Sequence, residues 1–261
     1  MKLEFVRLLA TQRDLYRLPR GPERFQTYLR TMLDPDSSDL RLPLSSMNPM
    51  AKDHVPRFLD LLAAMGVEEA GARATEEAAG PMAEEPGAFR VCLVVADDVS
   101  GGWTNRATAE LAHFRGEPAL ASRGWITGLL WASETYGPAE VREEVLISIY
   151  RTAFIARRGP ARTLRELLHQ EGTVMRMAGA RNPALEPHIL MKTREILAPR
   201  LDRDDPATMI SALFGDAVAR ELGHEALGLP PRAGLALALH GRLEPRRRRP
   251  SRDDPSDRAS S

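Results

Sequence analysis

The 261-residue sequence predicts a helix-rich α/β or α+β fold in which several helices pack around a small sheet. Two apolar runs, at 89–96 and 125–132, have little alternation, as expected of strands covered on both faces. The residues between these runs have a helical pattern, which is typical of a β–α–β crossover. We therefore expect the two strands to be parallel, with an antiparallel pairing as the lesser alternative.

The part of the chain before the first run is predicted to be mostly helical. The spacing of apolar residues and the positions of proline and glycine indicate helices at 2–10, 22–33 and 55–65. Residues 39–47 alternate like a strand, but Pro43 confines such a strand to an edge or a bulge. Residues 67–87 are acidic and contain two prolines, and we interpret them as a loop-rich insertion with a short solvent-facing helix.

The part after the second run is also helical. Helices are expected at 104–114, from Gly137-Pro138 to Gly159-Pro160, and at 164–178, 184–197 and 206–222. Thr163 and Glu166 form a capping-box pattern, and Asp205 precedes a proline at a helix start. Residues 229–242 fit either a strand or a short helix. We expect one globular domain over 1–242 and a disordered polar tail over 243–261.

Composition excludes some classes of protein and disfavours others. The formal net charge is zero, so no overall field attracts nucleic acid, and we do not expect a nucleic-acid partner. Cys92 is the sole cysteine, which excludes an intrachain disulfide and a cysteine-based metal cluster. The amino-terminal residues lack a signal-peptide pattern and no window is apolar enough to cross a membrane, so we expect a cytoplasmic protein. The excess of arginine over lysine is typical of bacterial genomes rich in G and C.

The main candidate site follows the first strand at its carboxyl end, where ligands bind in open α/β sheets. Adjacent residues of an extended chain point to opposite sides, so only one of Asp97 and Asp98 is expected to face a given cleft. Gly101 and Gly102 then allow a flexible bend, and Trp103 offers a flat apolar surface for a ligand. Thr104, Asn105 and Arg106 form the polar start of the next helix.

Two interpretations of this segment stay open. In the functional one, Asp97 or Asp98 is a catalytic base or a ligand of a divalent metal ion, and Arg106 holds an anion together with the helix N-terminus. In the structural one, the segment is a strand-to-helix turn in which an aspartate caps the helix. The phosphate-binding patterns G-x-x-x-x-G-K-[ST] and G-x-G-x-x-G are both absent.

Glu171 is the second candidate catalytic residue. At 100° per residue it falls in the middle of the apolar face of the 164–178 helix, where an unpaired carboxylate is costly. Either it forms an ion pair with Arg106, Arg151 or Arg181, or it opens onto a cleft with a raised pKa.

A third candidate lies just before the helix at 55–65. Lys52 can hold an anion and His54 can transfer protons, which would make this segment part of a ligand site. The alternative is simple helix capping, with Asp53 at the helix N-terminus and Lys52 in water.

These observations support two hypotheses about function. The first is an enzyme that acts on a small polar or anionic molecule at the end of the 89–96 strand. Its cofactor is unknown, and a divalent metal ion is the candidate. The second is a non-catalytic binding or scaffold protein, in which the same residues form a turn, a helix cap and a buried ion pair. The sequence does not identify the substrate, the reaction or the oligomeric state.

Overall fold

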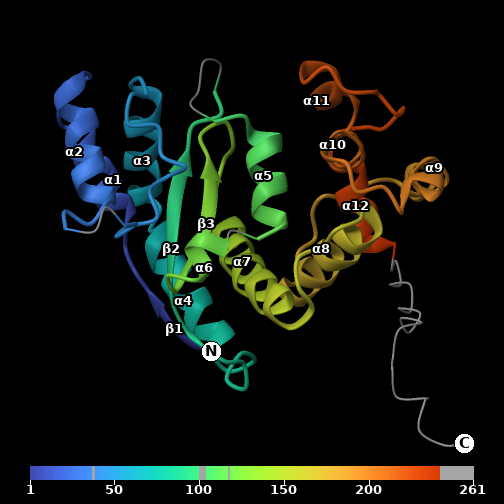
Figure 1. The fold of residues 1–261 in the computed structure, drawn as a ribbon, viewed down its shortest axis with the longest axis horizontal. Helices are drawn as coiled ribbons and strands as arrows, with labels where there is room; N and C mark the ends of the chain where they lie inside the picture. The colour runs from blue at the N-terminus through green and yellow to red at the C-terminus, as the bar shows by residue number, and fades with distance from the viewer. Residues whose placement is uncertain (37–38, 100–103, 117, 242–261) are drawn as a thin grey trace, which may run out of the picture.

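A computed structural model describes residues 1–36, 39–99, 104–116 and 118–241 (Figure 1). Its centre is a three-stranded parallel sheet with the order β1 (Lys2–Phe5), β2 (Ala88–Ala96), β3 (Trp125–Trp131). Phe5 pairs with Val91, and Ala96 pairs with Trp131 at the carboxyl edge. Both predicted strands and their parallel pairing are confirmed.

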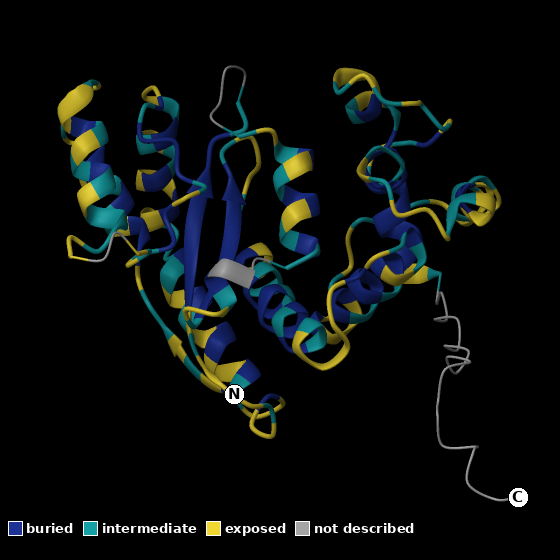
Figure 2. Ribbon diagram, viewed as in Figure 1, coloured by how far each residue is buried: buried dark blue, intermediate teal, exposed yellow. Residues whose placement is uncertain are grey.

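The two long strands are buried as their apolar sequences predict. Residues 91–96 of β2 and all of β3 are buried, so both faces of the sheet are covered at these positions (Figure 2). Continuous burial explains why neither run alternates between apolar and polar residues.

Helices α1–α7 occupy the first part of the chain and surround the sheet (Figure 1). They are α1 (Leu9–Leu15), α2 (Pro22–Met32), α3 (His54–Ala64), α4 (Val67–Ala79), α5 (Arg106–Phe114), α6 (Pro118–Ala121) and α7 (Pro138–Arg158). The predicted helices near 22–33, 55–65 and 104–114 and the long one after Gly137 are confirmed.

Three predictions about this part were wrong in detail. Residues 2–5 form β1 because their backbone pairs with β2, and the helix begins only at Leu9. Residues 39–47 form no strand. The strand-like pairing in this segment is limited to an isolated antiparallel bridge between Leu33 and Leu40. Helix α4 is not simply solvent-facing, since its small side chains and Gly71 pack on β1 and α7.

The remaining helices follow α7 and lie beside α5 (Figure 1). They are α8 (Leu164–Ala178), α9 (Pro187–Leu197), the short 3₁₀ helix η1 (Ala198–Arg200), α10 (Pro206–Phe214), α11 (Asp216–Glu221) and α12 (Ala233–His240). The capping box of α8 and the Asp205 cap of α10 are confirmed. The helix expected over 206–222 is broken at Gly215, whose φ is +89°. The predicted tail at 243–261 lies outside the described residues.

Buried apolar side chains in the described residues form two clusters. One contains the sheet and helices from the first part of the chain, including α7. The other contains α10, α12 and parts of α5 and α8. Helices α7 and α8 contact each other where the two clusters meet. No helix in the described ranges is long and apolar enough to cross a membrane.

Helix α12 is the centre of the second cluster, because all its residues from Ala233 to Leu239 are buried. Glycines allow its close contacts with two neighbours. A Cβ atom on Gly172 of α8 would lie 2.0 Å from the carbonyl oxygen of Ala238, and one on Gly234 would lie 2.3 Å from that of Ala212. The backbones of these helices therefore approach too closely for any larger residue.

We expect Gly172→Ala to lower the free energy of unfolding by about 3 kcal/mol, because the new methyl group overlaps the α12 backbone. Gly80→Ala is the matched control, since Gly80 has φ of −61° and open space around it. The control should be neutral or slightly stabilising. Urea denaturation of both variants measures the difference, and equal stabilities would contradict this close packing.

Candidate functional site

Asp97 and Asp98 follow β2 at the carboxyl edge of the sheet and bond to different parts of the molecule. The Asp97 carboxylate contacts Asn48 and His54, whereas the Asp98 carboxylate contacts Ser133 and Arg106. The expected divergence of the two side chains is confirmed. The predicted ligand-binding residues Gly101, Gly102 and Trp103 lie outside the described residues.

The buried Asp97 joins two segments that the sequence analysis treated separately. It accepts a hydrogen bond from Asn48 Nδ2 at 2.7 Å, and its Oδ1 lies 2.8 Å from His54 Nε2. His54 is half-buried and begins α3. Asp53 makes no side-chain capping bond there, and Lys52 is exposed. A carboxylate that orients a histidine in this way is an arrangement found in acid–base catalysis.

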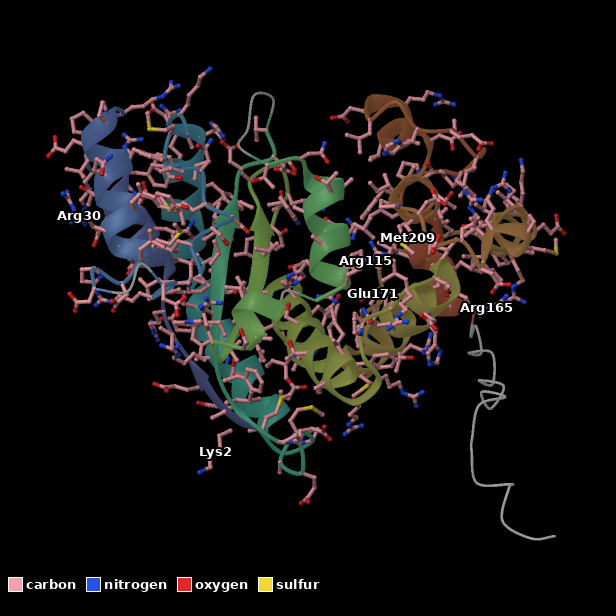
Figure 3. The ribbon with its side chains drawn as sticks, viewed as in Figure 1. Lys2, Arg30, Arg115, Arg165, Glu171 and Met209 are labelled. Carbon is pink, nitrogen blue, oxygen red and sulfur yellow. The ribbon has the colours of Figure 1, made fainter. Side chains whose placement is uncertain are left out.

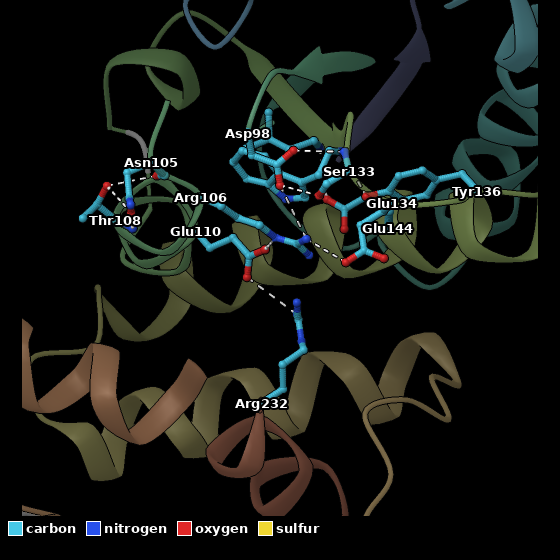
Figure 4. Close-up of polar contacts among 12 residues, drawn as sticks. Asp98, Asn105, Arg106, Thr108, Glu110, Ser133, Glu134, Tyr136, Glu144 and Arg232 are labelled. Carbon is cyan, nitrogen blue, oxygen red and sulfur yellow. Dashed lines mark hydrogen bonds and ion pairs between the residues drawn. The ribbon is translucent and has the colours of Figure 1, made fainter. Parts of the chain in front are cut away.

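Asp98 is held by the segment that follows β3. It accepts hydrogen bonds from Ser133 N at 3.0 Å and from Ser133 Oγ at 2.6 Å, and its Oδ2 lies 3.6 Å from Arg106 Nη1 (Figure 4). Asn105 caps α5, because its side chain accepts a hydrogen bond from Thr108 N. The start of α5 therefore lies beside Asp98.

Arg106 is the most highly connected cation at this edge. Its Nε donates to Glu110 Oε1 at 2.7 Å, and its Nη1 donates to Glu134 Oε1 at 2.6 Å (Figure 4). Partial burial alone would lower the pKa of Arg106, but the Glu110 and Glu134 carboxylates outweigh that effect and raise it. Arg106 is thus a permanent charge whose position is fixed by acids on two sides.

Arg232 reaches the same place from the C-terminal helices (Figure 4). Its Nη2 lies 3.6 Å from Glu110 Oε2, and its guanidinium makes no hydrogen bond within the described part of the chain. Its φ of +57° lies in the left-handed region, which is unfavourable for a residue with a side chain. The preceding loop is held by Asp216, whose carboxylate accepts hydrogen bonds from the backbone of residues 227–229.

An open cleft of about 600 Å³ lies between these groups. This volume is in the range of ligand-binding clefts. The start of α5 and Asp98 form one wall, and α10, α11 and Arg232 form the other. The lining residues are Asp98, Val99, Thr104, Asn105, Arg106, Ala107, Glu134, Phe214, Val218, Glu221, Pro231 and Arg232.

A second, smaller cavity of about 150 Å³ lies between α5, β3, α7, α8 and α12, and both Arg106 and Arg232 line it as well. Glu171 is one of its lining residues and lies between the two groups of helices (Figure 3). The Glu171 carboxylate forms a two-bond ion pair with Arg151: Nε donates at 3.0 Å and Nη2 at 2.8 Å. Both residues are buried, and the carboxylate raises the pKa of Arg151 despite the opposing effect of burial. Arg151 is one of the three partners that the sequence suggested.

Glu144 of α7 also lines the small cavity. Its Oε1 accepts hydrogen bonds from Leu129 N of the edge strand β3 and from Ser148 Oγ, both at 3.2 Å. Burial raises the pKa of Glu144, although the positive charge of Arg151 opposes this shift. A carboxyl group with a raised pKa inside a cavity is suited to giving or taking a proton.

The structure brings some of the predicted site residues together and separates others. Asp98 and Arg106 share the cleft, with Thr104 and Asn105, while Arg106 and Glu171 share the small cavity. Asp97, His54 and Lys52 line neither. Sequence analysis missed Glu110, Glu144 and Arg232. A signal existed for Glu144, since Glu144, Ser148 and Arg151 have the 4- and 3-residue spacing of one helix face.

Among the described residues, no group of three or more His, Cys, Asp or Glu side chains is placed to hold a metal ion. No protein family, curated protein or solved structure matches this chain.

We expect Glu171→Leu to lower the free energy of unfolding by about 3–5 kcal/mol, because Arg151 is left as a buried charge without a counter-ion. The double variant Arg151→Met/Glu171→Leu should recover most of this loss, since no buried charge remains. Thermal and urea denaturation of the single and double variants form the test. A single variant as stable as the parent would contradict the ion pair.

The raised pKa of Glu144 predicts that ionisation of this carboxyl group lowers the free energy of unfolding as the pH rises. Its folded-state pKa lies above the ordinary value of 4.5, so its contribution to stability is greatest below pH 4.5 and is lost as the pH rises through the folded-state value. Glu144→Gln removes this titration but keeps an oxygen for Leu129 N. The free energy of unfolding of Glu144→Gln, relative to the parent, should therefore increase with pH from 4.5 upward and then level off. If the difference in the free energy of unfolding between Glu144→Gln and the parent were constant across this range, the pKa of Glu144 would not be raised by folding.

Proposed function

We propose that this chain is an enzyme that acts on a small polar molecule carrying an anionic group, bound in the cleft at the carboxyl edge of the sheet. The observation that carries this proposal is Arg232, which lines the cleft, has an unfavourable left-handed backbone, and has Glu110 as an ion-pair partner at 3.6 Å. Strained residues of this kind concentrate at functional sites, where the side chain is needed in one position.

The start of α5 adds to the attraction for an anion. Thr104, Asn105, Arg106 and Ala107 all line the cleft, so the amino end of this nine-residue helix opens onto it. Asn105 satisfies the N–H of Thr108, which leaves the N–H groups of Arg106 and Ala107 in the first turn for a bound anion. An anionic group bound here would be attracted both by the positive end of the helix dipole and by the guanidinium charge of Arg232.

The acids of the cleft select the rest of the ligand. The lining of the cleft contains three acids, Asp98, Glu134 and Glu221, together with the two arginines. Carboxylates accept hydrogen bonds, which favours a ligand that also carries hydroxyl or amino groups. A molecule that is anionic at one end and hydroxylated along its length fits this distribution of charge.

Glu144 is the candidate acid–base group, because burial raises its pKa above that of an ordinary carboxylate. Glu144 lines the small cavity, and Arg106 and Arg232 line both this cavity and the cleft. Asp98 is a weaker candidate base, since its carboxylate already accepts two hydrogen bonds from Ser133 and lies beside Arg106.

A non-catalytic binding protein is the second candidate. The observation in its favour is that Asp97, Asp98, Arg106 and Glu171 are each already bonded to neighbouring groups. Such saturation is typical of residues whose role is to fix a structure. The two candidates share the same cleft and differ in whether the bound molecule is transformed.

We expect Arg232→Gly to weaken binding of an anionic ligand by about 10- to 100-fold, because a charge-assisted hydrogen bond is lost. Its stability should stay within about 1 kcal/mol of the parent, since glycine relieves the left-handed strain but gains freedom in the unfolded chain. Arg232→Lys keeps the charge and should bind with intermediate affinity.

Ribose 5-phosphate, ribose and inorganic phosphate form a matched set of probes for thermal-shift and calorimetric measurements. Ribose 5-phosphate should stabilise the parent most, because it combines the anionic group with hydroxyls. Proton NMR then follows whether bound compounds are converted, and Glu144→Gln should keep binding but stop conversion. Equal affinity of the parent and Arg232→Gly for the phosphorylated probe would exclude this anion site.

A further inference from the structure

Arg151 and Glu110 line the small cavity, and within the described part of the chain Arg151 Nη1 and Glu110 Oε2 are buried without a hydrogen-bond partner. Arg151 is 5% exposed and Glu110 is 6% exposed, so bulk water does not compensate them. Leaving such groups unsatisfied is costly, and native structures rarely do so without a reason. Both residues line the same 150 Å³ space.

The rest of each side chain is fixed, so neither atom can turn away to find another partner. Arg151 is clamped through Nε and Nη2 by Glu171, and its guanidinium lies over the ring of Phe114 with 4.9 Å between its Cζ and the ring centre. Glu110 is held through Oε1 by Arg106 Nε (Figure 4). Arg232 Nη2 lies 3.6 Å from Glu110 Oε2, which is beyond hydrogen-bond distance. Arg151 Nη1 therefore remains as a fixed donor and Glu110 Oε2 as a fixed acceptor.

The pair defines the chemistry of an occupant. Arg151 Nη1 requires an acceptor, and Glu110 Oε2 requires a donor. A carboxylate would satisfy the arginine but would face the Glu110 oxygen without a proton to give. A carboxamide offers both a carbonyl oxygen and N–H groups in one small planar unit, and it is neutral. A neutral ligand group suits this site because the charges of Arg151 and Arg106 are already compensated by carboxylate partners.

We propose that this cavity binds a small neutral carboxamide-type group. Its carbonyl oxygen accepts a hydrogen bond from Arg151 Nη1, and its N–H donates to Glu110 Oε2. A cavity of about 150 Å³ is large enough for a ring the size of benzene, so the space accommodates about six non-hydrogen atoms. This site is distinct from the anion site of the cleft, although Arg106 and Arg232 contribute to both.

Propionamide and propionate form a matched pair of probes, because they differ mainly in a donor NH₂ against an acceptor oxygen. Titration of each into the full-length protein is followed by the NMR signal of the Trp131 indole, which lines the cavity. The parent should bind propionamide with a dissociation constant on the order of 1 mM, and should prefer it over propionate by roughly tenfold or more.

Glu110→Gln makes the test specific. The glutamine can keep its oxygen on Arg106 Nε and place an NH₂ donor in the cavity, so the preference should reverse toward propionate. Ile147→Phe is the second variant: its larger side chain fills the cavity and should remove binding of both probes while Glu110 stays intact.

No binding of propionamide up to about 50 mM, as expected if the cavity holds ordered water only, would overturn the proposal. Equal binding of the two probes, or an unchanged preference in Glu110→Gln, would also overturn it. Propionamide is titrated without ribose 5-phosphate, and ribose 5-phosphate without propionamide, so the failure of one site is distinguishable from the failure of the other.

Discussion

The buried ion pair between Arg151 and Glu171 is the interaction on which the rest of the site depends. It joins α7, which packs on the sheet, to α8, which packs on the C-terminal helices. Two charges removed from water repay their desolvation only with good geometry and further hydrogen bonds. Here the two-bond geometry and a hydrogen bond from Gln170 Nε2 to Glu171 supply both. The pair therefore fixes how the two groups of helices meet, and it aims the third guanidinium nitrogen into the cavity.

The C-terminal helices complete a site that the sheet begins. The carboxyl edge of the sheet supplies Asp98 and the start of α5, but the facing wall comes from α10, α11 and Arg232. The position of Arg232 depends on the close contacts of α12 with α8 and α10, and on the loop that Asp216 holds. Packing far from the cleft thus determines where the Arg232 side chain lies, since the tightly packed α12 cannot shift without moving Arg232.

The sequence predicted features that have a local cause. The strands follow from continuous apolar runs, the helix starts follow from Asp205 and Thr163, and the isolation of Glu171 follows from its apolar stripe. It could not predict which arginine pairs with Glu171, because that depends on how α7 and α8 cross. The same limit hid the contact of His54 with Asp97 and the reach of Arg232 to Glu110. The strand at residues 2–5 was missed because so short a strand is defined by its partner.

Glu110 links the two compartments electrostatically. One of its oxygens is held by Arg106, and the other lies near Arg232 and faces the small cavity. An anion that draws Arg232 into the cleft removes positive charge from Glu110 and makes its free oxygen a stronger acceptor. A donor bound to that oxygen in turn weakens its hold on Arg232 and leaves the guanidinium more available to the cleft. If both proposed ligands bind, reciprocal coupling of binding free energies predicts that each strengthens binding of the other by the same factor.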